Sequence, residues 1–422
     1  MSAQPIELAA PVAHVTRHTR RRHSIGFWLT TYAFTVAMAF SAVPTPLYVL
    51  YQRRDGFSTT MITVIYGAYA VGVTASLFLA GHISDWIGRR RTLLAAVFLT
   101  LVAVLSFLLW RSTAGLIFAR VLNGLSIGVI TATATAYLSE LHAHGRPEAS
   151  GRRPEIVATA ANLGGIGLGP LVSGILAQWV ADPLTVPYLV FAGLLVVAFG
   201  ALLLVPETKW VPLELPRYRP QRVSVPAAAR GRYFAAASGG LIAFAAFGLF
   251  TSLAPTFLAQ TLGHTSRALA GAAVFAVFAT AAILQSLVGT RPARSLLLTG
   301  AVVMLLGLAL VTGAVWLSQP SLALFLLGGA VAGGGAGLVV KATLSTVVEL
   351  ALPENRAEAL AGFFLAAYIG LSVPVIGVGV ATSFVTARAA LLGFAALTLL
   401  GTVAVVAPVV RSPRLRRVDV PA

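Results

Sequence analysis

The chain has 422 residues, of which 58% are hydrophobic and only 10% charged, with a formal net charge of +17 and a mean hydropathy of +0.87. Soluble domains carry roughly 25% charged residues, so this composition excludes a water-soluble fold for most of the chain. The absence of cysteine excludes disulfides and thiolate chemistry.

Apolar runs recur along the whole chain, and each is long enough to cross a hydrocarbon core of about 30 Å. The short connections after the third, ninth and eleventh runs predict helical hairpins. In chain order we predict transmembrane helices at 27–50, 59–81, 93–111, 113–137, 156–179, 187–205, 233–259, 267–289, 295–317, 321–345, 357–383 and 387–409.

The Lys and Arg residues are unevenly divided between the two sides of these helices. Twenty-three lie on the side of the chain termini and five on the other, while Arg120 and Lys341 fall inside predicted helices. By the positive-inside rule, both termini lie in the cytoplasm of a bacterial inner membrane. The positive charge is then an orientation signal, and we expect the lipid bilayer rather than a nucleic acid as partner.

A polar, proline-containing stretch divides the chain into six helices and six helices. With an offset of 208 residues, Gly81 falls on Gly289, Pro46 falls beside Pro255, and Pro170 lands close to Pro374. Such internal repeats are typical of secondary transporters. We predict an all-α integral membrane fold of two pseudo-symmetric six-helix bundles: tail 1–24, bundle 25–205, cytoplasmic linker 206–232, bundle 233–410 and tail 411–422. The first 24 residues show no signal-peptide pattern.

The most specific motif is Gly-His-Ile-Ser-Asp-Trp-Ile-Gly-Arg-Arg-Arg, which begins at Gly81 between the second and third helices. Gly81 would allow close helix approach, and Gly88 would supply a positive-φ turn. The motif resembles the signature of the major facilitator superfamily, which implies that Asp85 and Arg89 latch the two halves in one state. Glu140, at the end of the fourth helix, is expected to join their network.

The corresponding turn of the second half departs from the pattern. After Gly289 it reads Thr-Arg-Pro-Ala-Arg, without an aspartate or a second glycine. Any gating interaction is therefore expected to be asymmetric.

Two further segments resemble motifs of the same superfamily. The first is Arg120-Val-Leu-Asn123-Gly in the fourth helix. Its arginine either snorkels to the outer interface or, as we favour, faces the cavity and takes part in proton or substrate coupling. The second is in the fifth helix, where Gly165, Gly169, Pro170 and Gly174 resemble a motif of drug–proton antiporters, although the family's earlier glycine is Ile156 here. These residues either mark a drug–proton antiporter or serve only the close packing of helices.

Other candidate residues are polar groups on helices expected to line a cavity, and each has a packing interpretation as well. Lys341 either snorkels inward or attracts an anionic substrate group or counter-ion. Two prolines near the outer end of the first helix, Pro44 and Pro46, are candidates for an outer gate because they free backbone carbonyls. The uncharged coupling or cavity candidates are Asn123, Asn162, Gln285 and Tyr368.

The expected function is secondary active transport by alternating access. Proton-coupled efflux of small amphiphilic or drug-like molecules is preferred, and uptake of a sugar or organic anion is the alternative. A membrane-embedded enzyme or a channel is a remote alternative, because the sequence offers no catalytic or metal-ligating constellation. All acidic residues fall in tails, loops or helix ends, and the candidates at the membrane rims are Asp55, Glu140 and Glu155. Proton coupling is expected to run through this rim, where Asp85 and Arg89 join Glu140, and through Arg120. We expect a monomer with no cofactor or metal, powered by the proton gradient.

Overall fold

The computed structural model describes residues 17–209, 218–221, 226–352 and 355–411, and their regular elements are all helices. Most of both tails and much of the predicted linker 206–232 lie outside the described residues. The helices are α1 (Arg17–Ala42), α2 (Tyr48–Asp55), α3 (Thr59–Ala80), α4 (Ile83–Ile87), α5 (Arg89–Leu109), α6 (Thr113–Gly145), α7 (Arg152–Thr159), α8 (Gly165–Trp179), α9 (Val186–Leu203), α10 (Arg230–Gln260), α11 (Arg267–Leu287), α12 (Ala293–Trp316), α13 (Leu322–Leu350), α14 (Arg356–Ala381) and α15 (Ala387–Arg411).

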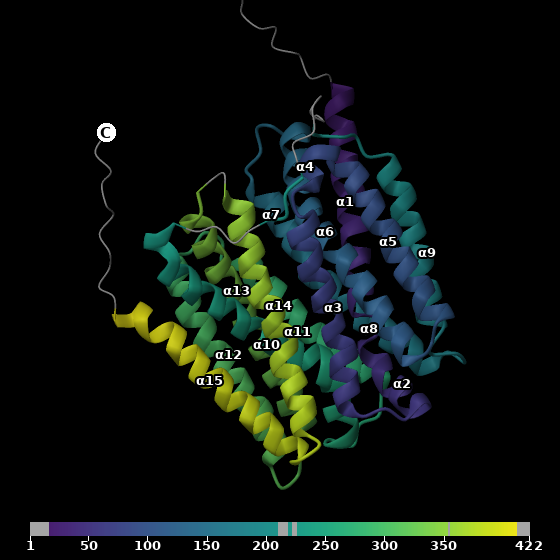
Figure 1. Cartoon of the computed structure of the whole chain (residues 1–422), viewed down its shortest axis with the longest axis vertical. Helices are drawn as coiled ribbons and strands as arrows, with labels where there is room; N and C mark the ends of the chain where they lie inside the picture. The colour runs from purple at the N-terminus through teal and green to yellow at the C-terminus, as the bar shows by residue number, and fades with distance from the viewer. Residues whose placement is uncertain (1–16, 210–217, 222–225, 353–354, 412–422) are drawn as a thin grey trace, which may run out of the picture.

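The described residues contain twelve helical spans that are long and apolar enough to cross a membrane. This confirms the predicted twelve-helix fold. The colour gradient of Figure 1 separates the chain into an early group of helices, from α1 to α9, and a late group, from α10 to α15. The groups repeat one packing pattern: α6 packs on α3 and α5 in the first, and α13 packs on α11 and α12 in the second. The openings of α3 and α11, at Thr59 and Arg267, are separated by the predicted 208 residues.

Several helix ends differ from the predicted ones. The first span is interrupted after Ala42 by a 3₁₀ turn, Thr45–Leu47, which begins at the predicted breakpoint beside Pro44. The fourth span continues to Gly145, two turns beyond the predicted end at residue 137, so Glu140 lies inside α6 rather than at its end. Hydropathy marks where the apolar stretch stops, whereas backbone hydrogen bonding continues into the polar layer.

The sixth and fifth spans also differ from the predictions. α9 ends at Leu203, before the predicted end at residue 205, and a Pro-Glu-Thr-Lys segment that begins at Pro206 follows it. The fifth span starts at Arg152 and contains a π-helical turn, Ala160–Gly164, between α7 and α8. Pro170 follows inside α8, and a proline leaves the carbonyl four residues earlier without its usual partner.

The two halves meet along two seams, where α3 packs on α14 and α8 packs on α11. Glycines bring the α8 and α11 backbones together: a Cβ on Gly174 would overlap the Arg267 carbonyl, and one on Gly271 would overlap the Pro170 carbonyl. Gly165 and Gly169 approach α1 in the same way. Small residues permit this approach in lipid, where packing rather than hydrophobic burial drives helix association.

Candidate functional site

The turn between the second and third spans is shaped by one glycine. Gly88 has φ 98° and ψ 152°, the conformation that the sequence predicts. A Cβ there would lie 2.5 Å from a carboxylate oxygen of Glu207. Gly81 has an ordinary helical φ of −59°, and its near neighbour is the side chain of Gln221. The expectation that Gly81 allows close helix approach is therefore wrong, because a linker residue occupies that space.

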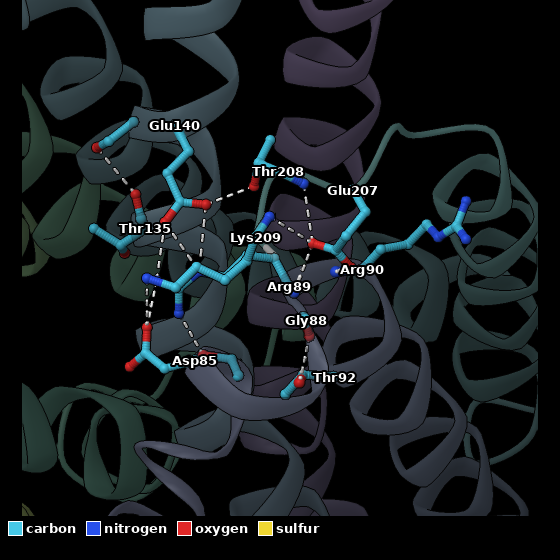
Figure 2. Close-up of polar contacts among 12 residues, drawn as sticks. Asp85, Gly88, Arg89, Arg90, Thr92, Thr135, Glu140, Glu207, Thr208 and Lys209 are labelled. Carbon is cyan, nitrogen blue, oxygen red and sulfur yellow. Dashed lines mark hydrogen bonds and ion pairs between the residues drawn. The ribbon is translucent and has the colours of Figure 1, made fainter. Parts of the chain in front are cut away.

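Arg89, the first residue of α5, is 7% exposed and fully surrounded by acceptors. Its Nη2 lies 2.8 Å from Asp85 Oδ1 and 2.9 Å from Glu140 Oε1, and its Nη1 donates to Ser84 Oγ at 2.6 Å. Figure 2 shows the guanidinium between the two carboxylates, which come from α4 and α6. The three side chains that the sequence grouped are thus in contact. Their role as a conformational latch stays a prediction.

Glu207 is a member of this group that sequence reasoning missed. Its carboxylate accepts hydrogen bonds from the backbone N–H groups of Arg89 at 2.9 Å and Arg90 at 3.1 Å. These are among the first N–H groups of α5, which have no partner within the helix and carry the positive end of the helix dipole. The adjacent Thr208 donates its hydroxyl to Glu140 (Figure 2).

We call Asp85, Arg89, Glu140, Glu207 and Thr208 the turn cluster. It ties together the ends of four spans of the first half on the predicted cytoplasmic side. The sequence signal for its last two members is the Glu-Thr pair directly after the sixth span. This pair was not among the residues expected to join the network.

The corresponding turn of the second half lacks such a cluster. α11 ends at Leu287, Gly289 has φ 58°, and α12 begins at Ala293. Arg294 donates to the Val410 carbonyl at 3.4 Å, and none of the ion pairs among the described residues lies at this turn. The expected asymmetry between the halves is therefore present in their contacts.

Arg120 is 2% exposed, so its side chain does not reach the outer interface and the snorkelling interpretation is wrong. Its Nη1 donates to the Ser41 carbonyl at 2.6 Å, and its guanidinium lies 4.5 Å from the ring centroid of Tyr69 and 5.5 Å from that of Tyr66. Arginine at mid-helix costs about 2.5–3.5 kcal/mol on insertion scales. Cation–π contact offsets part of that cost.

Polar atoms near this arginine are left without partners. Within the described residues, Arg120 Nε, both amide atoms of Asn123 and the Tyr48 hydroxyl are buried with no hydrogen bond. Asn123 lies one turn beyond Arg120 on α6 and is fully buried. Native proteins satisfy most buried polar groups, and each exception calls for an explanation.

Lys341 makes an ion pair between the halves. Its Nζ lies 3.1 Å from Glu155 Oε1 and donates to the Gln285 carbonyl at 2.9 Å. Gln285 in turn donates its side-chain amide to the Gly337 carbonyl at 2.8 Å. The two interpretations from sequence, inward snorkelling and attraction of an anionic group, both stay predictions, because Glu155 is 58% exposed near the predicted cytoplasmic side. In this structure the counter-ion is Glu155.

The predicted extracellular ends of the seams are also joined. Gln178, near the end of α8, accepts the backbone N–H of Arg267, and the Arg267 guanidinium donates to the Ala177 carbonyl, both at 2.8 Å. Thr60 donates to the Gly379 carbonyl at 3.0 Å. Each α8–α11 bond thus satisfies a free group at the end of one helix with a group from the other half.

The candidate outer-gate prolines lie at this level. Pro44 precedes the 3₁₀ turn and Pro46 is buried within it. Pro46 also lines a small cleft that reaches Pro255 and Arg267 of the second half. A gating role for the prolines stays a prediction.

Aromatic rings from both halves meet where the seams converge. The Tyr69 ring of α3 lies 6.2 Å from Tyr368 of α14, which lies 5.6 Å from Phe244 of α10. Phe247 follows at 6.2 Å and stacks on Phe278 of α11 at 4.9 Å. We call these five residues the interface aromatic cluster. The predicted cavity residue Tyr368 belongs to it, whereas Asn162 lies in the π-helical turn, which packs on α1 and α11.

A search of the described residues finds no group of three His, Asp or Glu side chains placed to hold a metal ion.

Comparison with known families gives one match of large extent. Residues 27–294, more than half of the chain, match the family described as the Major Facilitator Superfamily. A 168-residue segment is 25% identical to an uncharacterised MFS-type transporter of Methanocaldococcus jannaschii. That match spans 40% of this chain and 42% of the relative, less than half of its length.

Solved structures share the fold across nearly the full chain. The human organic anion transporter MFSD10 (TETRAN) has a TM-score of 0.65 at 17% identity, covering 92% of this chain and 99% of that one. A variant of the nucleoside transporter NupG has a TM-score of 0.69 at 12% identity, covering 91% and 99%. At these identities the likeness concerns the fold.

Proposed function

Because the chain belongs to the major facilitator superfamily and is therefore a secondary transporter rather than an enzyme, we propose that it exports small amphiphilic molecules by alternating access, in exchange for protons. The two solved structures with this fold are an organic anion transporter and a nucleoside transporter, so the substrate of this chain is inferred from its own residues.

The observation that carries the proposal is the interface aromatic cluster. Its five rings come from four helices, and the Tyr69–Tyr368 contact joins the two halves. A site that faces both halves is what a rocking carrier requires near the membrane midplane. Flat apolar rings with few hydrogen-bonding groups suit the apolar body of an amphiphile better than the hydroxyl-rich surface of a sugar.

Contacts between the two halves on both predicted sides of the membrane support alternation. The Arg267–Gln178 bond holds the predicted extracellular side, and the Lys341–Glu155 pair holds the predicted cytoplasmic side. A carrier that opens to either side has to break one of these at a time. Glu155 is 58% exposed, so water and protons reach it readily, and we include it with Asp85 and Glu140 among the proton-coupling candidates.

Export rather than uptake is favoured by the glycine motif of the fifth span, where Gly165, Gly169, Pro170 and Gly174 resemble the drug–proton antiporter pattern. Uptake of a sugar or organic anion is the alternative, and the sign of the flux distinguishes the two.

The test uses proteoliposomes with an imposed pH gradient and three fluorescent amphiphiles of different charge: ethidium, fluorescein and N-phenyl-1-naphthylamine. We expect at least one dye to move against its gradient, from the face that bears the turn cluster to the opposite face, and to stop when a protonophore is added. Tyr368→Ala should lower this flux severalfold. Phe384→Ala is the matched control, because Phe384 is an aromatic residue that is 83% exposed outside the interface.

Movement that is indifferent to the protonophore would contradict proton coupling. Flux in the reverse direction would favour the uptake alternative. Equal loss in the Tyr368 and Phe384 variants would remove the interface aromatic cluster from the site.

A further inference from the structure

Charge is distributed unevenly within the transmembrane spans. Among the described residues, Arg120 and Lys341 are the charged side chains that lie seven or more residues from both ends of their helices. Lys341 is neutralised by Glu155. Arg120 takes part in none of the ion pairs among these residues. Of the two, Arg120 is therefore the cation without a counter-ion among the described residues.

This cation stands directly behind the surface where the halves meet. Its guanidinium contacts the rings of Tyr66 and Tyr69. Tyr69 continues to Tyr368 in the second half, and the Tyr66 hydroxyl bonds to Thr251 of α10. One layer of rings therefore separates Arg120 from the second half, and the interface aromatic cluster begins in that layer.

The site also has unused hydrogen-bonding capacity. The Arg120 Nε–H, the Asn123 amide and the Tyr48 hydroxyl are buried without partners. The first two donors lie one turn apart on α6, and both residues are at least 98% buried. Donors in such positions suit an acceptor group that is absent while the transporter is empty.

The approach from the predicted extracellular side is basic as well. The cleft between the halves is lined by Arg53, His264 and Arg267, and no Asp or Glu belongs to its lining. Positive groups at the mouth of a cleft raise the local concentration of anions and lower that of cations.

We propose that the transported amphiphile is a monoanion, whose carboxylate or sulfonate group is balanced by Arg120 while its apolar body packs on the interface aromatic cluster. The inference rests on the proposed function and adds the charge of its substrate. A cationic amphiphile would place a second positive charge beside Arg120 in a low-dielectric interior, and a neutral one would leave Arg120 without a counter-ion. In this structure the two tyrosine rings and the Ser41 carbonyl contact the guanidinium.

The test compares three probes that share one aromatic body and differ in charge: 2-naphthoate, 2-naphthamide and 2-naphthylmethylamine, at pH 7.5. Each is offered to proteoliposomes that contain the full chain, under the same imposed pH gradient. We expect 2-naphthoate to be transported at least tenfold faster than the amide and the amine. Liposomes without protein, under the same gradient, give the passive rate that is subtracted for each probe.

Two variants locate the selectivity. Arg120→Lys keeps the charge and should keep the preference for 2-naphthoate at a reduced rate. Arg120→Gln removes the charge and should lower the ratio of 2-naphthoate transport to 2-naphthamide transport at least tenfold, so that the preference disappears. Elution as a single species in size-exclusion chromatography and an unchanged thermal midpoint show that each variant is folded.

The outcomes separate the two proposals. Faster transport of the amide or the amine than of 2-naphthoate would overturn the inference and leave amphiphile transport standing. A preference for 2-naphthoate that persists in Arg120→Gln would overturn the assignment to Arg120. Transport of none of the three naphthyl probes would overturn the inference, and lack of movement of the three dyes as well would overturn the proposed function.

Discussion

The turns that follow the second and eighth spans occupy equivalent places in the two halves, yet they are held in different ways. In the first half, Arg89 contacts two carboxylates, and Glu207 caps the helix that begins there. In the second half, Arg294 makes one long bond to a carbonyl, and a proline rather than a carboxylate precedes the helix. Both turns contain a glycine with positive φ. The backbone geometry of the repeat is thus retained where its polar network is not, because a tight turn needs the glycine in either case.

The largest expected difference between the turns comes from their arginines. Arg89→Ala removes the buried cation that Asp85 and Glu140 share and leaves only Lys209, 3.6 Å from Asp85, so we expect it to lower the free energy of unfolding by about 3 kcal/mol. Arg294→Ala removes an exposed side chain and should change it by less than about 0.5 kcal/mol. Denaturant titration of both proteins in detergent micelles measures the difference. Equal losses would contradict an asymmetric latch.

Arg89→Ala is also expected to change the transport cycle. If the turn cluster holds one state of the carrier, the variant should show a changed ratio of inward to outward exposure. Since the chain has no cysteine, a single cysteine placed at Thr63, which is buried against Gly379, reports that ratio through its rate of maleimide labelling. An unchanged labelling rate would limit the cluster to a structural role.

The two glycines provide the next comparison. Gly88→Ala forces a side chain into a region of φ and ψ that only glycine adopts readily, and its Cβ would meet the Glu207 carboxylate. We expect a loss of about 3 kcal/mol. Gly289 has φ 58°, and a Cβ there would make only an ordinary contact with the Arg152 guanidinium at 3.7 Å, so Gly289→Ala should cost about 1 kcal/mol. Thermal midpoints in the same detergent rank the two, and a larger loss for Gly289→Ala would be inconsistent with these geometries.

The helix caps are expected to differ less. Glu207→Gln keeps the shape of the side chain but removes the charge that faces the first N–H groups of α5, and we expect a loss of about 1 kcal/mol. The control is Glu358→Gln, in the first turn of α14, where the helix has no side-chain cap bond. It should cost less than about 0.5 kcal/mol. Denaturant midpoints in low salt compare the two variants. High salt should screen both carboxylates and reduce the difference between the two stability losses.

The smallest expected effect is a dependence of stability on pH that arises only in the turn after the second span. Burial lowers the pKa of His82 below its ordinary value of 6.5, and Asp85 opposes that shift. Because the folded protein binds this proton less tightly than the unfolded chain, stability falls as the pH drops below about 6.5. His82→Gln should flatten the thermal midpoint between pH 7.5 and 5.5. A profile that stays as steep in the variant would assign the dependence to other groups.

Sequence patterns anticipated the helices and part of the site, for identifiable reasons. Asp85 and Arg89 lie one helical turn apart, so local spacing predicts their contact, and Glu140 was added because the fourth span ends on the same side. Glu207 lies 118 residues from Arg89, and no local pattern places a carboxylate at the start of α5. The Lys341–Glu155 pair joins residues 186 apart in opposite halves, which explains why sequence alone left Lys341 with two interpretations, neither of which named its partner.

What the sequence determined by itself is the membrane-spanning character, the twelve helices and their repeat, because apolar length and its 208-residue periodicity are properties of the chain and not of its packing. Even the motif that begins at Gly81 specified its turn locally, through a glycine at the one position with unusual dihedral angles. Only the tertiary structure decided which charges are paired. Arg120 and Lys341 look alike in sequence, as single cations inside apolar helices. Packing gave Lys341 a carboxylate from the other half and placed Arg120 against aromatic rings. In a low-dielectric interior the energy of a charge depends strongly on the groups packed around it.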